Sequence, residues 1–170
     1  DLTKEVIDAD GFFHTGDIGT LVEGRFLKIT DRKKEIFKTS GGKYIAPQMI
    51  ENKFKESSFI EQVIVVGENQ KHPAALIVPA FAFVKSWCEK HGIPAKTHEE
   101  IAANAEVKKR IKEEIDKLNS GFGQWEQVKK IELLPAEFSI ANNELTPTLK
   151  LKRKVILAKY AHLVNKIYNE

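Results

Sequence analysis

Apolar residues gather in short runs that predict several β-strands. The expected strands are residues 11–30 as the two halves of a hairpin, EIFKTS and KYI as a short pair, and the runs 62–66, 74–81 and 128–134. The hairpin turn is expected at Glu23 and Gly24, which separate two apolar runs. The continuous apolar runs 62–66 and 74–81 are typical of interior strands covered on both faces.

Apolar residues at helical spacing predict helices between these strands. Pro47 suits the first position of a helix, where it loses no needed hydrogen bond. Ile50 and Phe54 follow in PQMIENKFKES, and their four-residue spacing would turn both toward the core. The segment 82–92 is expected to form a helix that ends at Gly92.

Two longer amphipathic regions are expected in the second half of the chain. Thr97 and Glu100 form a capping-box pattern that opens a long helical region. Its apolar residues recur at helical spacing, with Lys and Glu on the other faces: Val107, Ile111, Ile115 and Leu118. Residues 151–168 are expected to form a second amphipathic helix. The sum is a compact α+β domain, with a few strands flanked by helices, preceded by a separate β segment.

Composition narrows the class of protein. Hydrophobic residues make up 42% of the 170 residues, which is enough for a packed core. Lys and Arg number 27 against 24 Asp and Glu, so the overall charge does not indicate a nucleic-acid-binding protein. The single cysteine, Cys88, excludes an internal disulfide and a cysteine zinc site, and fits a reducing, cytoplasmic compartment. The longest apolar run, 74–84, is too short to span a bilayer.

The common enzyme signatures are missing from this sequence. None of the five histidines has a His or Cys partner at metal-ligand spacing, so no metal site is expected. There is no G-x-S-x-G, Walker loop or G-x-G-x-x-G. The chain starts at Asp1 without a Met or a signal peptide, and we expect it to be a piece of a longer protein.

Two charged residues near the hairpin are candidates for binding a nucleotide. Asp17 lies between Gly16 and Gly19, where a short carboxylate can accept two hydrogen bonds from a vicinal diol such as a ribose. The alternative is an aspartate that stabilises its own turn. Arg32 could add a donor to the same ribose, or form a surface ion pair with Asp31 or Glu35.

Lys150 is the candidate for charge stabilisation. Pro147 favours an extended loop before it, so the lysine lies near the junction of a loop and a helix. There its ammonium could be delivered to an anion. The alternative is a solvated helix start, although lysines at a helix N-terminus oppose the helix dipole.

Three motifs in this order resemble the carboxy-terminal part of the acyl-adenylate-forming enzymes: HTGDIG, ITDRKKEIFKTSGGKYIAP and LTPTLKLKRK. This superfamily contains acyl-CoA synthetases, luciferases and peptide-synthetase adenylation domains. The likeness is closest to the long-chain fatty-acid CoA ligases and runs over essentially the whole chain. It implies that residues 1–33 end a large AMP-binding domain and that residues 34–170 form a small mobile lid domain.

The resemblance also implies roles for single residues. Asp17 would bind the ribose hydroxyls of the adenylate, and Arg32 would join it. Lys34 would be the hinge about which the lid rotates, which suits the dense charge of residues 31–38, although a solvated loop would have the same composition. Lys150 would stabilise charge while the substrate carboxylate attacks the α-phosphate.

A second surface of the lid is implied for the later half of the reaction. The turn formed by Gly41, Gly42, Lys43 and Tyr44 would line the tunnel for the pantetheine of CoA. The Gly-Gly pair carries one residue more than shorter relatives have, and Leu149 replaces the glycine common before the lysine.

The resemblance implies ATP, CoA and a fatty acid as substrates, with Mg²⁺ held together with ATP by the missing amino-terminal large domain. The piece alone would then be inactive, and residues 1–33 would be its less well-packed part. Peripheral contact with a membrane would suit a long-chain substrate, although no amphipathic anchor is visible. The alternatives are the lid of a ligase for short-chain, aromatic or amino acids, a basic nucleic-acid-binding module, and a non-catalytic interaction domain.

Overall fold

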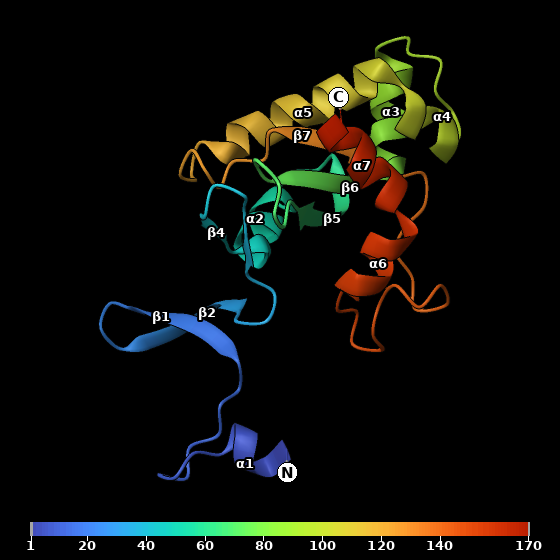
Figure 1. Ribbon diagram of the computed structural model, residues 1–170. Helices are drawn as coiled ribbons and strands as arrows, with labels where there is room; N and C mark the ends of the chain where they lie inside the picture. Colours follow the sequence, from blue (N-terminus) through green and yellow to red (C-terminus); the bar gives the residue numbers. More distant parts are fainter. Residues whose placement is uncertain (1, 170) are drawn as a thin grey trace.

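A three-stranded sheet lies at the centre of the body in Figure 1, and the computed structural model describes residues 2–169. Within that range the strands are β1 (Asp17–Val22), β2 (Phe26–Arg32), β3 (Phe37–Lys38), β4 (Tyr44–Ile45), β5 (Ile60–Val66), β6 (Ala74–Pro79) and β7 (Lys130–Leu133). The central sheet has the order β5-β6-β7, with β6 antiparallel to β5 and parallel to β7. The strands β1 and β2 form one hairpin, and β3 and β4 form another.

Helices cover this sheet, which confirms the α+β fold. They are α1 (Leu2–Val6), α2 (Pro47–Phe54), α3 (Phe81–Lys90), α4 (His98–Ala103), α5 (Ala105–Asn119), α6 (Arg153–Lys159) and α7 (Ala161–Asn169). Helix α2 packs against β5, and α5 and α7 both contact β7. The parallel crossover from β6 to β7 passes through α3, α4 and α5, as a parallel pair requires. No helix in residues 2–169 is both long and apolar enough to cross a bilayer.

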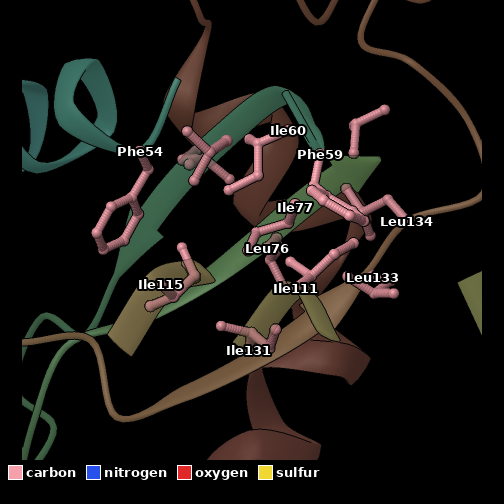
Figure 2. Close-up of a cluster of buried hydrophobic side chains, with 14 of the residues drawn as sticks. Phe54, Phe59, Ile60, Leu76, Ile77, Ile111, Ile115, Ile131, Leu133 and Leu134 are labelled. Carbon is pink, nitrogen blue, oxygen red and sulfur yellow. The ribbon is translucent and has the colours of Figure 1, made fainter. Parts of the chain in front are cut away.

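The core is built from the apolar faces that the helical spacing predicts. Figure 2 shows Phe54 of α2 and Ile115 of α5 beside Leu76 of β6, with Ile131 of β7 nearby. All four side chains are buried. The prediction that Ile50 and Phe54 face the core is confirmed, as is the burial of Val107, Ile111 and Ile115.

The two apolar runs predicted as interior strands have different positions. Every residue of β6 is buried, because the strand has a neighbour on each side. Both faces of β5 are covered, as predicted, but its predicted interior position is wrong, because β5 is an edge strand of the described sheet. Its apolar residues are nevertheless buried, since α2 packs against it and lies directly before it in the chain.

The N-terminal hairpin has the expected turn. Glu23 and Gly24 have φ angles of 53° and 69°, and the N–H of Arg25 donates to the carbonyl of Val22 at 3.2 Å. Positive φ at both central residues matches the right-handed twist of the strands. The large apolar side chains of this hairpin, such as Leu27, are exposed, so the expectation of looser packing in residues 1–33 is confirmed for the hairpin.

The two long helical regions are each interrupted, and the single helix predicted over 151–168 is wrong. The capping box at Thr97 and Glu100 is present, but α4 ends at Ala103, with Asn104 as its C-cap. The Asn104 side chain accepts hydrogen bonds from the N–H groups of Glu106 and Val107 and starts α5. The second break lies at Tyr160, between α6 and α7, where the buried ring packs edge-on against Phe138. Helical spacing carries no signal for such tertiary contacts.

Candidate functional site

A cavity of about 410 Å³ brings three of the predicted site residues together. Asp17 and Arg32 line it from the hairpin, and Lys150 lines it from the segment before α6. Glu51 of α2 and Arg153 of α6 also line it. Residues separated by more than a hundred positions in sequence therefore meet at one surface.

Asp17 and Arg32 face each other across the hairpin. They are paired in the register of β1 and β2, and Arg32 Nε lies 3.3 Å from Asp17 Oδ1. The register shifts between Ile18 and Gly19, which is a β-bulge directly beside Asp17. The partner of Arg32 in this ion pair is thus Asp17, rather than the Asp31 or Glu35 weighed from sequence.

Lys150 closes a small hairpin before α6, and does not belong to the helix. Leu145 and Leu151 form an isolated β-bridge, and Thr146 N–H donates to the carbonyl of Lys150 at 2.8 Å. The N–H of Lys150 donates to Thr146 Oγ1 at 3.0 Å. The main chain of the lysine is therefore fixed while its side chain is exposed to the cavity.

Leu149, directly before the lysine, adopts a left-handed backbone. Its φ is +60°, and its N–H donates to the carbonyl of Thr146 at 2.8 Å. A residue in this conformation after a turn lets a three-residue hairpin close, and glycine adopts it without steric cost. The side chain of Leu149 is 69% exposed, so little packing compensates the strain.

Arg153 is the main residue that sequence reasoning missed. Its Nη2 lies 2.6 Å and 2.7 Å from the two carboxylate oxygens of Glu51, and its Nε lies 3.1 Å from Glu35 Oε2. Its Nη1 donates to the carbonyl of Val65 at 3.1 Å. The sequence offers a solvated helix start only as the alternative for the run KLKRK. The one available signal for Arg153 is that a single arginine, with its planar donor fork, stands among lysines.

The Glu51–Arg153 pair is buried, with 5% and 15% of the side chains exposed. Burial raises the pKa of the Glu51 carboxyl, and the guanidinium together with the Val65 N–H opposes this shift. Burial opposes the charge on Arg153, but attraction to Glu51 outweighs it and raises the pKa of the guanidinium. Removal of either partner would leave the other charge buried without compensation, which destabilises the fold.

The proposed hinge residue lies in an exposed turn. Lys34 is flanked by Glu35, whose N–H donates to the carbonyl of Arg32 at 2.9 Å. On the other side, the buried carboxylate of Asp31 accepts from Arg32 N–H at 2.6 Å and from Gln48 N–H at 3.2 Å. Burial raises the pKa of Asp31. This aspartate thus caps α2, whose N-cap residue makes no side-chain cap bond.

The turn predicted to line a pantetheine tunnel lies away from this cavity. Thr39 N–H donates to the carbonyl of Lys43 at 2.9 Å, and Gly42 has a φ of +80°, which a residue with a side chain rarely adopts. Tyr44 is 67% exposed, and the Lys43 ammonium lies 5.3 Å from the centre of the Trp125 ring. Gly41, Gly42, Lys43 and Tyr44 are absent from the lining of the Asp17 cavity. The structure thus keeps the two predicted surfaces separate.

Across residues 2–169 no group of three or more His, Cys, Asp or Glu side chains is arranged to hold a metal ion. The cavity carries both signs of charge, since it has three carboxylates beside two arginines and two lysines. An anionic group entering it would meet Lys150 and Arg32, while a hydroxyl donor would meet Asp17. This arrangement suits a ligand that carries both a phosphate and a diol.

Comparison with known proteins identifies related sequences and structures. Residues 34–170 match the family described as AMP-binding enzyme C-terminal domain. The chain is 43% identical over 170 residues to long-chain-fatty-acid–CoA ligase 1 of Homo sapiens, covering 98% of this chain and 24% of that protein. It is 46% identical over 161 residues to long-chain-fatty-acid–CoA ligase 5 of Rattus norvegicus, covering 93% and 23%.

A solved structure shares the fold. The A-PCP didomain of carboxylic acid reductase from Segniliparus rugosus, in complex with AMP, superposes with a TM-score of 0.80 at 25% identity. The match covers 99% of this chain and 22% of that one. The chain thus spans about a quarter of the length of the relatives it matches.

Proposed function

Because this chain belongs to the AMP-binding enzymes, whose C-terminal domain matches residues 34–170, we propose that it is the carboxy-terminal part of an acyl-CoA synthetase. The whole protein would use ATP to convert a carboxylic acid into an acyl-adenylate, and would then transfer the acyl group to CoA. The observation that carries this proposal is the cavity shared by Asp17, Arg32 and Lys150. Residues 1–33 would be the end of a large AMP-binding domain that precedes the lid.

The first half-reaction explains the charged groups of the cavity. A carboxylate oxygen of the substrate attacks the α-phosphorus of ATP, and the bond to the departing pyrophosphate breaks. Negative charge builds on the phosphoryl oxygens, where the ammonium of Lys150 would stabilise it. Asp17 would accept hydrogen bonds from the ribose hydroxyls, and Arg32, which contacts Asp17, would add a donor beside them.

The second half-reaction would use the other surface. The thiolate of CoA attacks the acyl carbon, the bond to the phosphate oxygen breaks, and AMP leaves. The turn from Gly41 to Tyr44 would line the pantetheine channel after the lid has rotated about Lys34. The separation of this turn from the Asp17 cavity supports two alternating lid positions.

A long-chain fatty acid is the proposed substrate. Support comes from the two long-chain-fatty-acid–CoA ligases that are 43% and 46% identical to this chain. The acyl pocket, the phosphate-binding loop and the ligands of the Mg²⁺ that accompanies ATP would all belong to the preceding domain. Adenylation assays with acids of different length, together with aromatic and amino acids, would distinguish this substrate from the alternatives.

The proposal is tested by Lys150→Ala in the full-length protein. Adenylation, measured as pyrophosphate exchange, should fall by about 10²–10³, because one charge-stabilising donor is lost. Thioester formation from supplied acyl-adenylate should be retained, since the acyl group is already activated.

Lys154→Ala is the matched control, because this exposed lysine belongs to the same basic run but does not line the cavity. It should leave both half-reactions unchanged. Equal loss of both half-reactions in Lys150→Ala would contradict the role given to Lys150.

A further inference from the structure

One buried arginine ties the end of the loop that carries Lys150 to three other parts of the lid, in addition to the apolar packing of Leu145 and Leu151. Arg153 lies three residues after Lys150 and begins α6. Helix α6 has no side-chain N-cap bond and no acidic residue in its first turn. The usual local devices that fix the start of a helix are therefore missing here, and the position of this start depends on longer-range contacts.

Arg153 supplies these contacts to three separate parts of the lid. It binds both oxygens of Glu51 on α2, one oxygen of Glu35 beside the hinge turn, and the carbonyl of Val65 on β5. Glu51 also accepts from the Val65 N–H at 2.7 Å. A planar guanidinium held by three partners in different directions has little freedom to rotate or shift.

Arg153 is also connected, through Glu35 and Gln48, to Asp31 before the proposed hinge. Glu35 Oε2, which accepts from Arg153, also accepts from the Gln48 side-chain amide at 2.8 Å. The Gln48 N–H in turn donates to Asp31. A continuous series of hydrogen bonds therefore connects Asp31, on one side of the proposed hinge, with the helix start beside Lys150.

We infer that Arg153 is a positioning residue that holds Lys150 at the reacting phosphate during adenylation. This inference rests on the proposed function. Arg153 acts through the geometry of the 145–151 hairpin, whose last residue precedes it by two positions. A displacement of about 1 Å in a group that stabilises a transition state can cost about a hundredfold in rate.

The test uses Arg153→Lys in the full-length protein, because lysine keeps the positive charge beside Glu51 but cannot contact Glu51, Glu35 and Val65 together. Adenylation should fall about ten- to a hundredfold, while thioester formation from supplied acyl-adenylate is retained. Glu35→Gln leaves the Glu51–Arg153 pair intact and should also lower adenylation. This second variant tests the inference if Arg153→Lys does not fold.

A double-mutant cycle separates positioning from general stability. If Arg153 acts through Lys150, Arg153→Lys should have no further effect on adenylation when Lys150 is already alanine. The matched control is Arg110→Lys on α5, since this partly buried arginine forms an ion pair with Glu114 at 2.7 Å and lies outside the cavity. It should leave both half-reactions unchanged.

Three results would overturn the inference. The first is that Arg153→Lys lowers adenylation by the same factor whether residue 150 is lysine or alanine. The second is that Arg153→Lys lowers both half-reactions equally. The third is full adenylation by Arg153→Lys while Lys150→Ala is impaired, which would leave the proposed function standing. Full adenylation by Lys150→Ala would instead overturn the proposed function, and this inference with it.

Discussion

At the scale of single residues, Leu149 carries measurable strain beside Lys150. Its φ of +60° costs a residue with a side chain roughly 1–2 kcal/mol. Glycine is normally less favourable than alanine, because it loses more conformational freedom on folding. We expect the order to be reversed here, with Leu149→Gly more stable than Leu149→Ala by about 1 kcal/mol in the free energy of unfolding.

Urea denaturation of the two variants measures this difference. Leu149→Ala is the control for the lost side chain, since both substitutions remove the same exposed contacts. An alanine variant as stable as the glycine variant would show that residue 149 does not keep the left-handed backbone in solution.

Residues that line the candidate cavity were predictable where a residue type has an unusual local setting. Asp17 between glycines and Lys150 after a proline were selected on that basis, and the structure brings both to one cavity. Arg153 and Glu51 were missed, because an arginine in a basic run and a glutamate in an amphipathic helix are usually solvated. Their pairing depends on α2 and α6 meeting at the edge of β5, which one sequence does not specify.

At the scale of elements, Glu132 joins two helices to β7. Its Oε1 lies 2.9 Å from the Lys108 ammonium of α5 and 3.1 Å from the Lys166 ammonium of α7. Burial opposes the charged carboxylate, but the two lysines outweigh it and lower the pKa of Glu132 below its ordinary value of 4.5. Such a group stabilises the fold above its unfolded pKa, and this stabilisation is lost as the pH falls through its folded pKa.

Glu132→Gln should therefore lower the free energy of unfolding by about 1 kcal/mol at neutral pH, a value kept small because both lysines are partly exposed. The difference from the unmodified chain should shrink as the pH falls below 4.5. Denaturation at several pH values measures it, with the exposed Glu61→Gln as control. A cost that stays constant with pH would mean that Glu132 contributes through packing alone.

The elements themselves were largely predictable from local pattern. The hairpin turn, the helix that begins at Pro47 and the capping box at Thr97 each depend on neighbouring residues, and all three are present. The breaks at Asn104 and Tyr160 were not predicted, since apolar spacing continues across both. At Asn104 the side chain accepts hydrogen bonds from the first turn of α5, and at Tyr160 the ring packs against Phe138.

At the scale of the whole molecule, the chain combines a packed body with a poorly covered hairpin (Figure 1). Leu21 and Leu27 are paired across β1 and β2 and are 66% and 68% exposed, whereas β6 is wholly buried. A two-stranded hairpin without a covering layer is marginally stable.

Amide hydrogen exchange should therefore be faster in residues 17–32 than in residues 74–79 of the 170-residue chain, by about a hundredfold or more. In the full-length protein the hairpin amides should become protected, if a preceding domain covers them as proposed. Equal protection of the two segments in the chain alone would show that the hairpin is stable without such a cover.

The side chains that secure α6 also protect the outer border of the central sheet. Val65 directs its N–H to Glu51 and its carbonyl to Arg153, so neither main-chain group is available to a strand from a neighbouring molecule. Open strand borders are where proteins add foreign strands and begin to aggregate. We therefore expect the Glu51–Arg153 ion pair to disfavour strand addition at this border as well, independently of any role in chemistry.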